Sequence, residues 1–169
     1  MFRCPAQSNA PDKNAIRLDH GMSNYRSVSG WEDGGGFMPA NNTTRDWGGI
    51  VFYNSKIRFN MVPDGTSNTV VIGECVYDPI PTVDKWAAIW SGHTGIYGGG
   101  VRISDNQWRL DEASANINGP APQAFGSRHR NGAYFAYGDG GVRFFKTGGN
   151  AVLLKYAAGR ADGRQIPDH

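Results

Sequence analysis

The sequence predicts an α+β fold built mostly of antiparallel β-strands, with long glycine-rich loops and one short helix near the C-terminus, at about 150–158. Three observations support this fold class: glycine is frequent, at 24 residues, charged residues make up only 19% of the chain, and the apolar runs are short. A length of 169 residues suits one domain, which we place at 1–169. A hydrophobic content of 39% is too high for a disordered chain.

The first 49 residues are expected to be mostly irregular, because turn-forming residues are spread throughout them. One strand is predicted through Tyr25 and Val28. The stretch NNTT at 41–44 contains two overlapping Asn-x-Thr sequons, so Asn41 and Asn42 are glycosylation candidates if the chain enters a glycosylating compartment.

Residues 50–77 are predicted to form strands joined by turns. Ile57, Phe59 and Met61 alternate with polar residues, which is the period of a half-buried strand. The following PDGTSN, at 63–68, is a turn, because its Pro, Asp-Gly and short polar side chains favour turn geometry. The β-branched run TVVIGECV, at 69–76, predicts a buried strand. On a period of two, the side chains of residues 70, 72 and 74 share one face of that strand.

Beyond residue 77 the signals become weaker until residue 125. A strand is predicted at 86–90, followed by a long connection with two short strands around 101–103 and 108–110. A connection this long, and this poor in regular patterns, often carries a function or an interaction surface.

The stretch RHRNGAYFAYGDGGVRFF, at 128–145, predicts a β-hairpin with strands at 133–137 and 142–145. Asp139-Gly140 lies between the strands and indicates a type I′ turn. His129 and Asp139 cannot share a metal ion, because ten residues of strand separate their side chains by about 30 Å. We therefore expect Asp139 to stabilise the turn and His129 to lie at the far end, near the chain that leaves the second strand.

A helix is expected after the hairpin. Asn150 can cap its N-terminus and Gly159 can end it. The apolar stripe that would pack on the sheet consists of Val152, Leu153, Tyr156 and Ala157.

Glu74 is unusual because it lies within an apolar strand, and a buried carboxylate needs a partner. Arg58, on the strand predicted next to it, is a candidate partner for a structural ion pair. The alternative is a catalytic acid, which has less support because no second carboxylate accompanies Glu74 in the sequence.

Several functional classes are excluded by composition and spacing. The net charge is +2 without a basic block, so nucleic acid is not an expected partner, and no apolar run is long enough for direct membrane insertion. None of the four histidines has metal-ligand spacing, and no HExxH, GxSxG or phosphate-loop motif occurs. We therefore expect no cofactor and no catalysis. Calcium is the metal that the loops PDGTSN, VYDP and SDNQ would suit best.

The two cysteines, Cys4 and Cys75, belong to no CxxC pair. Composition alone leaves two alternatives equally open: a disulfide that closes a long loop, or two unrelated thiols.

Four stretches occur in an order that resembles a bacterial family, domain of unknown function 1559, which is abundant in planctomycetes. They are FRCP at 2–5, NSKIRFNMVPDGTSNTVVIGE at 54–74, FGSRHRNGAYFAYGDGGVRFF at 125–145 and LLKYAAGRADGRQI at 153–166. The motif residues that match are Asp64, Gly65, Thr66, Ser67, Asn68, Thr69 and Glu74 in the central stretch, and His129, Asp139 and Gly140 in a His-x9-Asp-Gly signature. Gly141 departs from the serine that is usual there.

The family is similar to pseudopilins and type IV pilins, whose members typically begin with a prepilin segment and a long hydrophobic helix. We expect the present sequence to correspond to the pilin-like head domain without this helix, which was either removed or is not used by a divergent member. The resemblance implies a secreted protein at the cell surface or outside the cell, and it makes a Cys4–Cys75 disulfide the favoured alternative.

The function that the resemblance implies is a non-catalytic structural subunit of an extracellular filament, pseudopilus or surface assembly, with other copies of the chain as partners. The alternative is an extracellular module that binds carbohydrate or peptide through exposed aromatic side chains at 77–125. A hydrolase would need a pocket that brings Glu74, a histidine and another carboxylate together.

Overall fold

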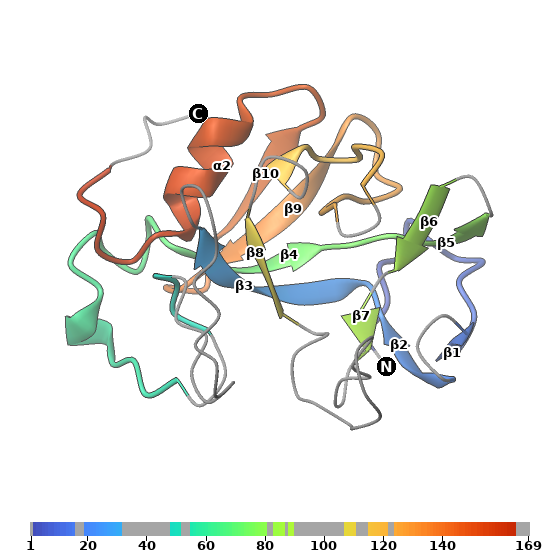
Figure 1. Cartoon of the computed structure of the whole chain (residues 1–169), viewed down its shortest axis with the longest axis horizontal. Helices are drawn as coiled ribbons and strands as arrows, with labels where there is room; N and C mark the ends of the chain where they lie inside the picture. The colour runs from blue at the N-terminus through green and yellow to red at the C-terminus, as the bar shows by residue number, and fades with distance from the viewer. Residues whose placement is uncertain are drawn as a thin grey trace, which may run out of the picture.

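A five-stranded sheet with strand order β10-β9-β4-β3-β8 organises the computed structural model (Figure 1). Its strands are β3 (Tyr25–Trp31), β4 (Val70–Glu74), β8 (Gln107–Leu110), β9 (Gly132–Tyr137) and β10 (Val142–Lys146). Neighbouring strands are antiparallel except for the parallel pair β3 and β8. The predicted α+β class with mostly antiparallel pairing is therefore confirmed.

The structure describes residues 2–15, 19–31, 48–51, 55–80, 83–86, 88–89, 107–110, 115–121 and 124–164. The strand predicted around 101–103 and the sequons at Asn41 and Asn42 lie outside these residues. Within them, no helix has the length and apolar character needed to cross a bilayer.

Two smaller sheets lie beside the main one (Figure 1, right). One consists of β1 (Lys13–Asn14), β2 (His20–Ser23) and β7 (Ala88–Ile89), and the other of β5 (Tyr77–Ile80) and β6 (Val83–Trp86). The N-terminal region is thus richer in strands than its turn-forming composition predicts, because partners far along the chain stabilise short strands that have no alternating pattern of their own.

Helix α2 (Ala151–Ala158) is capped as predicted. The Asn150 side chain accepts a hydrogen bond from the Val152 N–H at 2.9 Å, and Gly159 ends the helix. The predicted apolar stripe is partly wrong, because Val152 is 41% exposed while Leu154 and Ala158 are buried with Ala157. The helix presents residues 154, 157 and 158 to the core.

The main core lies between α2 and one face of the five-stranded sheet, which we call the inner face. Phe135 of β9 packs against Phe125 and Phe145, with ring centroids 5.6 and 5.2 Å apart. Gly73 of β4 pairs with Phe135, and a Cβ at Gly73 would lie 2.4 Å from the Phe135 ring. Glycine is therefore favoured there, because a Cβ would overlap the Phe135 and Phe125 rings.

The opposite face of the sheet, which we call the outer face, includes two central cross-strand rows and, beyond them, Lys146 opposite Gly132. From their register, the rows contain Val142, Ala136, Ile72 and Ser27, and then Phe144, Tyr134, Glu74 and Tyr25. A β-bulge between Val70 and Ile72 places Val70 in the core and Ile72 on the outer face. The prediction that residues 70, 72 and 74 share one face is therefore correct only for the last two.

The strand predicted at 57–61 is wrong. Residues Phe59–Met61 form a short 3-10 helix, η2, and Phe59 is 79% exposed. The Met61 N–H donates to the Arg58 carbonyl at 2.8 Å, and Val62 donates to Phe59 in the same way. Among the described residues no strand pairs with this segment, and alternation alone does not hold an unpaired strand.

The β9–β10 hairpin is confirmed, but its turn differs from the type I′ prediction. Gly140 has a φ of +88°, whereas Asp139 is not among the described residues with positive φ. The Gly140 N–H donates to the Tyr137 carbonyl at 3.0 Å, and the Tyr137 N–H donates to the Gly141 carbonyl at 2.8 Å. This pattern is a three-residue loop in which Gly140 takes the left-handed bulge position.

Candidate functional site

Three side chains that can ligate a metal meet at one end of the outer face. The Sγ of Cys4, a carboxylate oxygen of Glu74 and a ring nitrogen of His129 all lie within 4.8 Å of one another. The three come from the N-terminal segment, the end of β4 and the loop that leads into β9. We call them the Cys-Glu-His cluster.

Glu74 is fixed by a hydrogen bond from the neighbouring strand β9. Its side chain is only 3% exposed, and its Oε2 accepts a hydrogen bond from the Tyr134 backbone N–H at 2.7 Å. The predicted ion pair with Arg58 is wrong: Arg58 is exposed beside η2, and its segment does not join the sheet. Glu74 instead directs its Oε1 toward His129, at 3.3 Å from Nε2.

Cys4 is held by Asn24, a fully buried residue just before β3. The Asn24 side chain accepts a hydrogen bond from the Cys4 N–H at 3.2 Å and donates to the Cys75 carbonyl at 3.0 Å. The Asn24 N–H also donates to the Phe2 carbonyl at 2.9 Å. These bonds attach the N-terminal segment to the sheet and place the Cys4 thiol beside Glu74.

His129 is positioned by a turn just before β9. Its backbone N–H donates to Ser127 Oγ at 3.1 Å, and that hydroxyl donates to the Gly132 carbonyl at 2.7 Å. The imidazole packs edge-on against Tyr134 and is 31% exposed. Asp139 lies at the other end of β9, where its Oδ1 accepts from the Gly141 N–H at 2.8 Å, so it serves the turn as predicted.

The geometry of the Cys-Glu-His cluster differs from that of a catalytic triad. The Cys4 Sγ and the Glu74 Oε1 both lie 3.3 Å from the same histidine nitrogen, Nε2. A triad needs the nucleophile on one ring nitrogen and the carboxylate on the other. Burial, together with a hydrogen bond to Glu74, raises the pKa of the Cys4 thiol to about 11, so the sulfur is protonated at neutral pH and is a poor nucleophile.

The predicted disulfide is absent, since Cys4 and Cys75 are both free and buried. The Cys75 Sγ lies 3.8 Å from the Ser23 carbonyl, whereas the Cys4 Sγ contacts His129. Each sulfur thus has a partner other than the second cysteine. Burial also raises the pKa of Cys75, to about 11.

The DGTSNT motif connects the turn before β4 to the segment after α2. The Asp64 carboxylate accepts backbone N–H bonds from Asp162 and Gly163, at 2.7 and 3.1 Å. Within the turn, Gly65 has a φ of +88°, Thr66 is half-buried, and the Asn68 side chain donates to the Asp64 carbonyl. The Thr69 hydroxyl donates to the Gly65 and Gly159 carbonyls. The Arg143 guanidinium donates to the Ser67 carbonyl. The motif therefore has a structural role.

The acidic residues expected to suit calcium have protein partners. Asp64 accepts the two N–H bonds just described, and Asp78 pairs with the Arg128 guanidinium. Residues 104–106 of the third loop lie outside the described part of the chain. Calcium binding stays a prediction.

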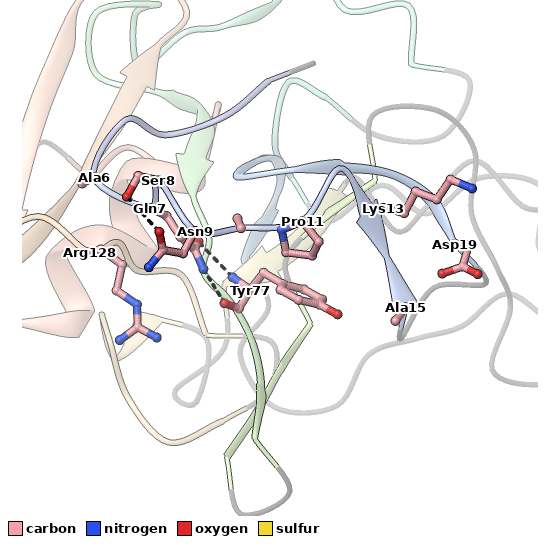
Figure 2. A pocket seen from close by; sticks show the side chains of 11 residues that line it. Ala6, Gln7, Ser8, Asn9, Pro11, Lys13, Ala15, Asp19, Tyr77 and Arg128 are labelled. Atoms are coloured by element: carbon pink, nitrogen blue, oxygen red, sulfur yellow. Dashed lines mark hydrogen bonds between the residues drawn. The ribbon is translucent and has the colours of Figure 1, made fainter.

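A cavity of about 740 Å³ opens beside β1 and β5. It is lined by Ala6, Gln7, Ser8, Asn9, Ala10, Pro11, Lys13, Ala15, Asp19, Tyr77 and Arg128. Figure 2 shows Arg128 at one end, Lys13 and Asp19 at the other, and Tyr77 between them. The Gln7 amide is hydrogen-bonded to Asn24 and to the Tyr77 backbone, and Arg128 is paired with Asp78. These polar groups are therefore less available to a ligand in the cavity.

Cys4 is a partner of Glu74 and His129 that was not predicted from the sequence. A signal was present, because FRCP, the IGE that ends the central stretch, and GSRH each carry one residue able to ligate a metal. The spacing along the chain, 70 residues and then 55, gives no local motif, and only the fold brings the three together.

The fold and the site together define a β-rich α+β domain with a buried Cys-Glu-His cluster. Residues 1–148 match the family model described as protein of unknown function (DUF1559), and the chain belongs to this family, as the resemblance in the sequence indicated. Neither a curated protein nor a solved structure matches the chain.

Proposed function

We propose that this chain is a non-catalytic structural subunit that assembles with copies of itself, outside the cell or at its surface, in a filament, pseudopilus or related array. The observation that carries the proposal is the apolar outer face of the five-stranded sheet. Val142 is 61% exposed there, and Tyr134 and Ile72 are 43% and 41% exposed.

An apolar face of this kind is unusual for a sheet that meets water. Antiparallel sheets that are solvated on one side normally alternate apolar residues inward with polar residues outward. Here the outward positions of β4, β9 and β10 include Ile72, Tyr134 and Val142. Exposed apolar side chains gathered on one surface mark an interaction site.

The charge pattern favours a second copy as the occupant. In the two central rows the charged residue is Glu74, whose side chain is buried in the Cys-Glu-His cluster, while Lys146 lies at the end of β10, opposite Gly132. These two rows therefore offer a partner mainly apolar surface. A symmetric contact between two copies would bury one apolar face against the other.

The test is the mass of the particle as a function of protein concentration, by analytical ultracentrifugation, with electron microscopy of the concentrated sample. We expect the wild-type chain to self-associate and to form regular arrays. Ile72→Lys and Val142→Lys each place a charge on the outer face and should abolish association, because an unpaired charge would be buried in the contact.

Val152→Lys is the matched control, since Val152 on α2 is 41% exposed, as Ile72 is. This variant should associate like the wild type, and circular dichroism should show all three variants to be folded. A wild-type protein that stays monomeric at high concentration would contradict the proposal, and so would association that survives both outer-face lysines.

A second candidate function is a carbohydrate-binding module, and the cavity at Tyr77 is the observation that favours it. Its volume of about 740 Å³ is within the range of small-molecule sites, which is roughly 300–1,000 Å³. Titration calorimetry with oligosaccharides that bind in a glycan screen tests this function. Binding that Lys13→Ala weakens and Lys146→Ala leaves unchanged would support it, and a screen without any binding would refute it.

A further inference from the structure

The Cys-Glu-His cluster combines three donor types in one small space, and it does so without a local sequence motif. Cys4 and Glu74 are each 3% exposed, so they are not surface groups that meet by chance. Each also has a backbone anchor: Asn24 holds the Cys4 N–H, and the Tyr134 N–H holds the second oxygen of Glu74. The anchors leave the sulfur and one carboxylate oxygen directed at His129.

Two of the distances in the cluster match those between ligands that share one tetrahedral ion. With metal–ligand bonds of about 2.0–2.3 Å, neighbouring ligand atoms of a tetrahedral zinc site lie about 3.3–3.6 Å apart. Both Cys4 Sγ and Glu74 Oε1 lie 3.3 Å from His129 Nε2. One N–H or one lone pair of a ring nitrogen aligns well with one of two such atoms at a time, whereas an ion placed among the three atoms would engage all of them.

We propose that Cys4, Glu74 and His129 bind one Zn²⁺ ion, with a water molecule as the fourth ligand. Thiolate, imidazole and carboxylate are the donors that zinc takes in proteins, whereas calcium and magnesium take oxygen donors alone. The His129 side chain is 31% exposed, so the cluster borders the solvent that would supply the water. This site goes beyond the assembly role proposed above and does not depend on it.

Charge and proton balance are consistent with the site. Zn²⁺ displaces the thiol proton of Cys4 to solvent, and the resulting thiolate and the Glu74 carboxylate together neutralise the two positive charges of the ion. The histidine binds as the neutral imidazole. A neutral set of this kind is the arrangement that a buried site tolerates, because an uncompensated charge would be strongly destabilised there.

The ion would link three segments that are distant in sequence: the N-terminal segment, the end of β4 and the loop before β9. The ion would thus fix the N-terminal segment to the sheet through Cys4. The predicted disulfide would have made a similar link, but between Cys4 and Cys75. Zinc binding should therefore raise the thermal midpoint of unfolding of the whole chain.

The experiment starts from the reduced chain, stripped of metal with a chelator. Zn²⁺ is titrated in competition with a chromophoric chelator, and Co²⁺ serves as a spectroscopic probe. We expect one Zn²⁺ per chain and, with Co²⁺, a thiolate-to-metal charge-transfer band together with the intense visible absorption of a four-coordinate ion. Cys4→Ser, Glu74→Gln and His129→Gln should each weaken zinc binding by at least about 100-fold, since even residues that only support a ligand cost 10–100-fold when lost.

Two controls separate ligation from folding. Cys75→Ser removes the other buried thiol, and His20→Gln removes a histidine on β2, and both should bind zinc like the wild type. Glu74→Gln retains an oxygen that can accept the Tyr134 N–H, so it should stay folded by circular dichroism while losing zinc. A wild-type chain without the Co²⁺ thiolate band would overturn the proposal, as would a Glu74→Gln chain that binds zinc as tightly as the wild type.

Discussion

The two faces of the five-stranded sheet differ in what their side chains do. On the inner face, apolar side chains such as Phe135 and Val28 are fully buried against α2 and its neighbouring loops. On the outer face, apolar side chains such as Val142 are exposed, and the buried group is a carboxylate, Glu74. The inner face therefore supplies the stability of the fold, while the outer face carries the proposed contact surface and the zinc site.

This difference follows from the local sequence of each strand. In β9, residues 133, 135 and 137 are Ala, Phe and Tyr and are buried, while the outward Tyr134 meets His129 and Phe144. A strand with aromatic or apolar residues at both parities has two faces that avoid water. One of these faces is buried within the monomer, and the other is available to contact a partner or to carry a chemical site.

The largest effect is expected from a truncation in the centre of the inner face. Phe135→Ala should lower the free energy of unfolding by about 3–5 kcal/mol, because it leaves a cavity between Phe125 and Phe145. Urea denaturation followed by circular dichroism measures this change. Phe59→Ala, the same substitution at a side chain that is 79% exposed, should change stability by no more than about 0.5 kcal/mol. Equal losses in the two variants would contradict the assignment of the core.

The next largest loss of stability is expected when a methyl group is added to the inner face. Gly73→Ala should cost about 1–3 kcal/mol, because its Cβ would lie 2.4 Å from the Phe135 ring and 2.6 Å from the Phe125 ring. The double variant Gly73→Ala with Phe135→Leu tests the cause. If the clash is responsible, the double variant should lose less than the sum of the two single losses. An additive result would mean that the alanine acts in some other way.

The inner face and its connections could be predicted well from the sequence, because their signals are local. The Asp-Gly pair between two β-prone runs indicated the hairpin, and Asn150 and Gly159 marked the ends of α2. The predictions of the turn type and of the apolar stripe on α2 were less accurate. Whether a strand contains a β-bulge, and which residues of a helix face the core, depends on packing against the rest of the molecule. A short stretch of sequence does not contain that information.

The candidate site could not be predicted to the same degree. Glu74 was recognised as a buried carboxylate in need of a partner, but the partner was chosen from the nearest apparent strand, which does not form. His129 and Cys4 are 55 and 70 residues away, and the fold alone brings them to Glu74. The short strands of the N-terminal region were missed for the same reason, since pairing with distant strands creates them.

A smaller effect is expected at the helix that covers the inner face. Asn150→Ala removes the side-chain acceptor of the Val152 N–H and should cost about 1 kcal/mol. Thermal unfolding by calorimetry measures the loss, and Asn150→Asp serves as the control because aspartate caps helices about as well. If both variants lose the same stability, capping is not the reason for the loss.

The smallest effect on the monomer should come from the outer face itself. Val142→Thr keeps the shape of the side chain and adds a hydroxyl, and because Val142 is 61% exposed, monomer stability should change by no more than about 0.5 kcal/mol. The same substitution at Val28, which is fully buried on the inner face, should cost about 1–3 kcal/mol, because the hydroxyl has to leave water. Urea denaturation at low protein concentration compares the two. A large loss for Val142→Thr in the monomer would mean that the outer face is satisfied within one chain, and the case for a second copy against it would then fail.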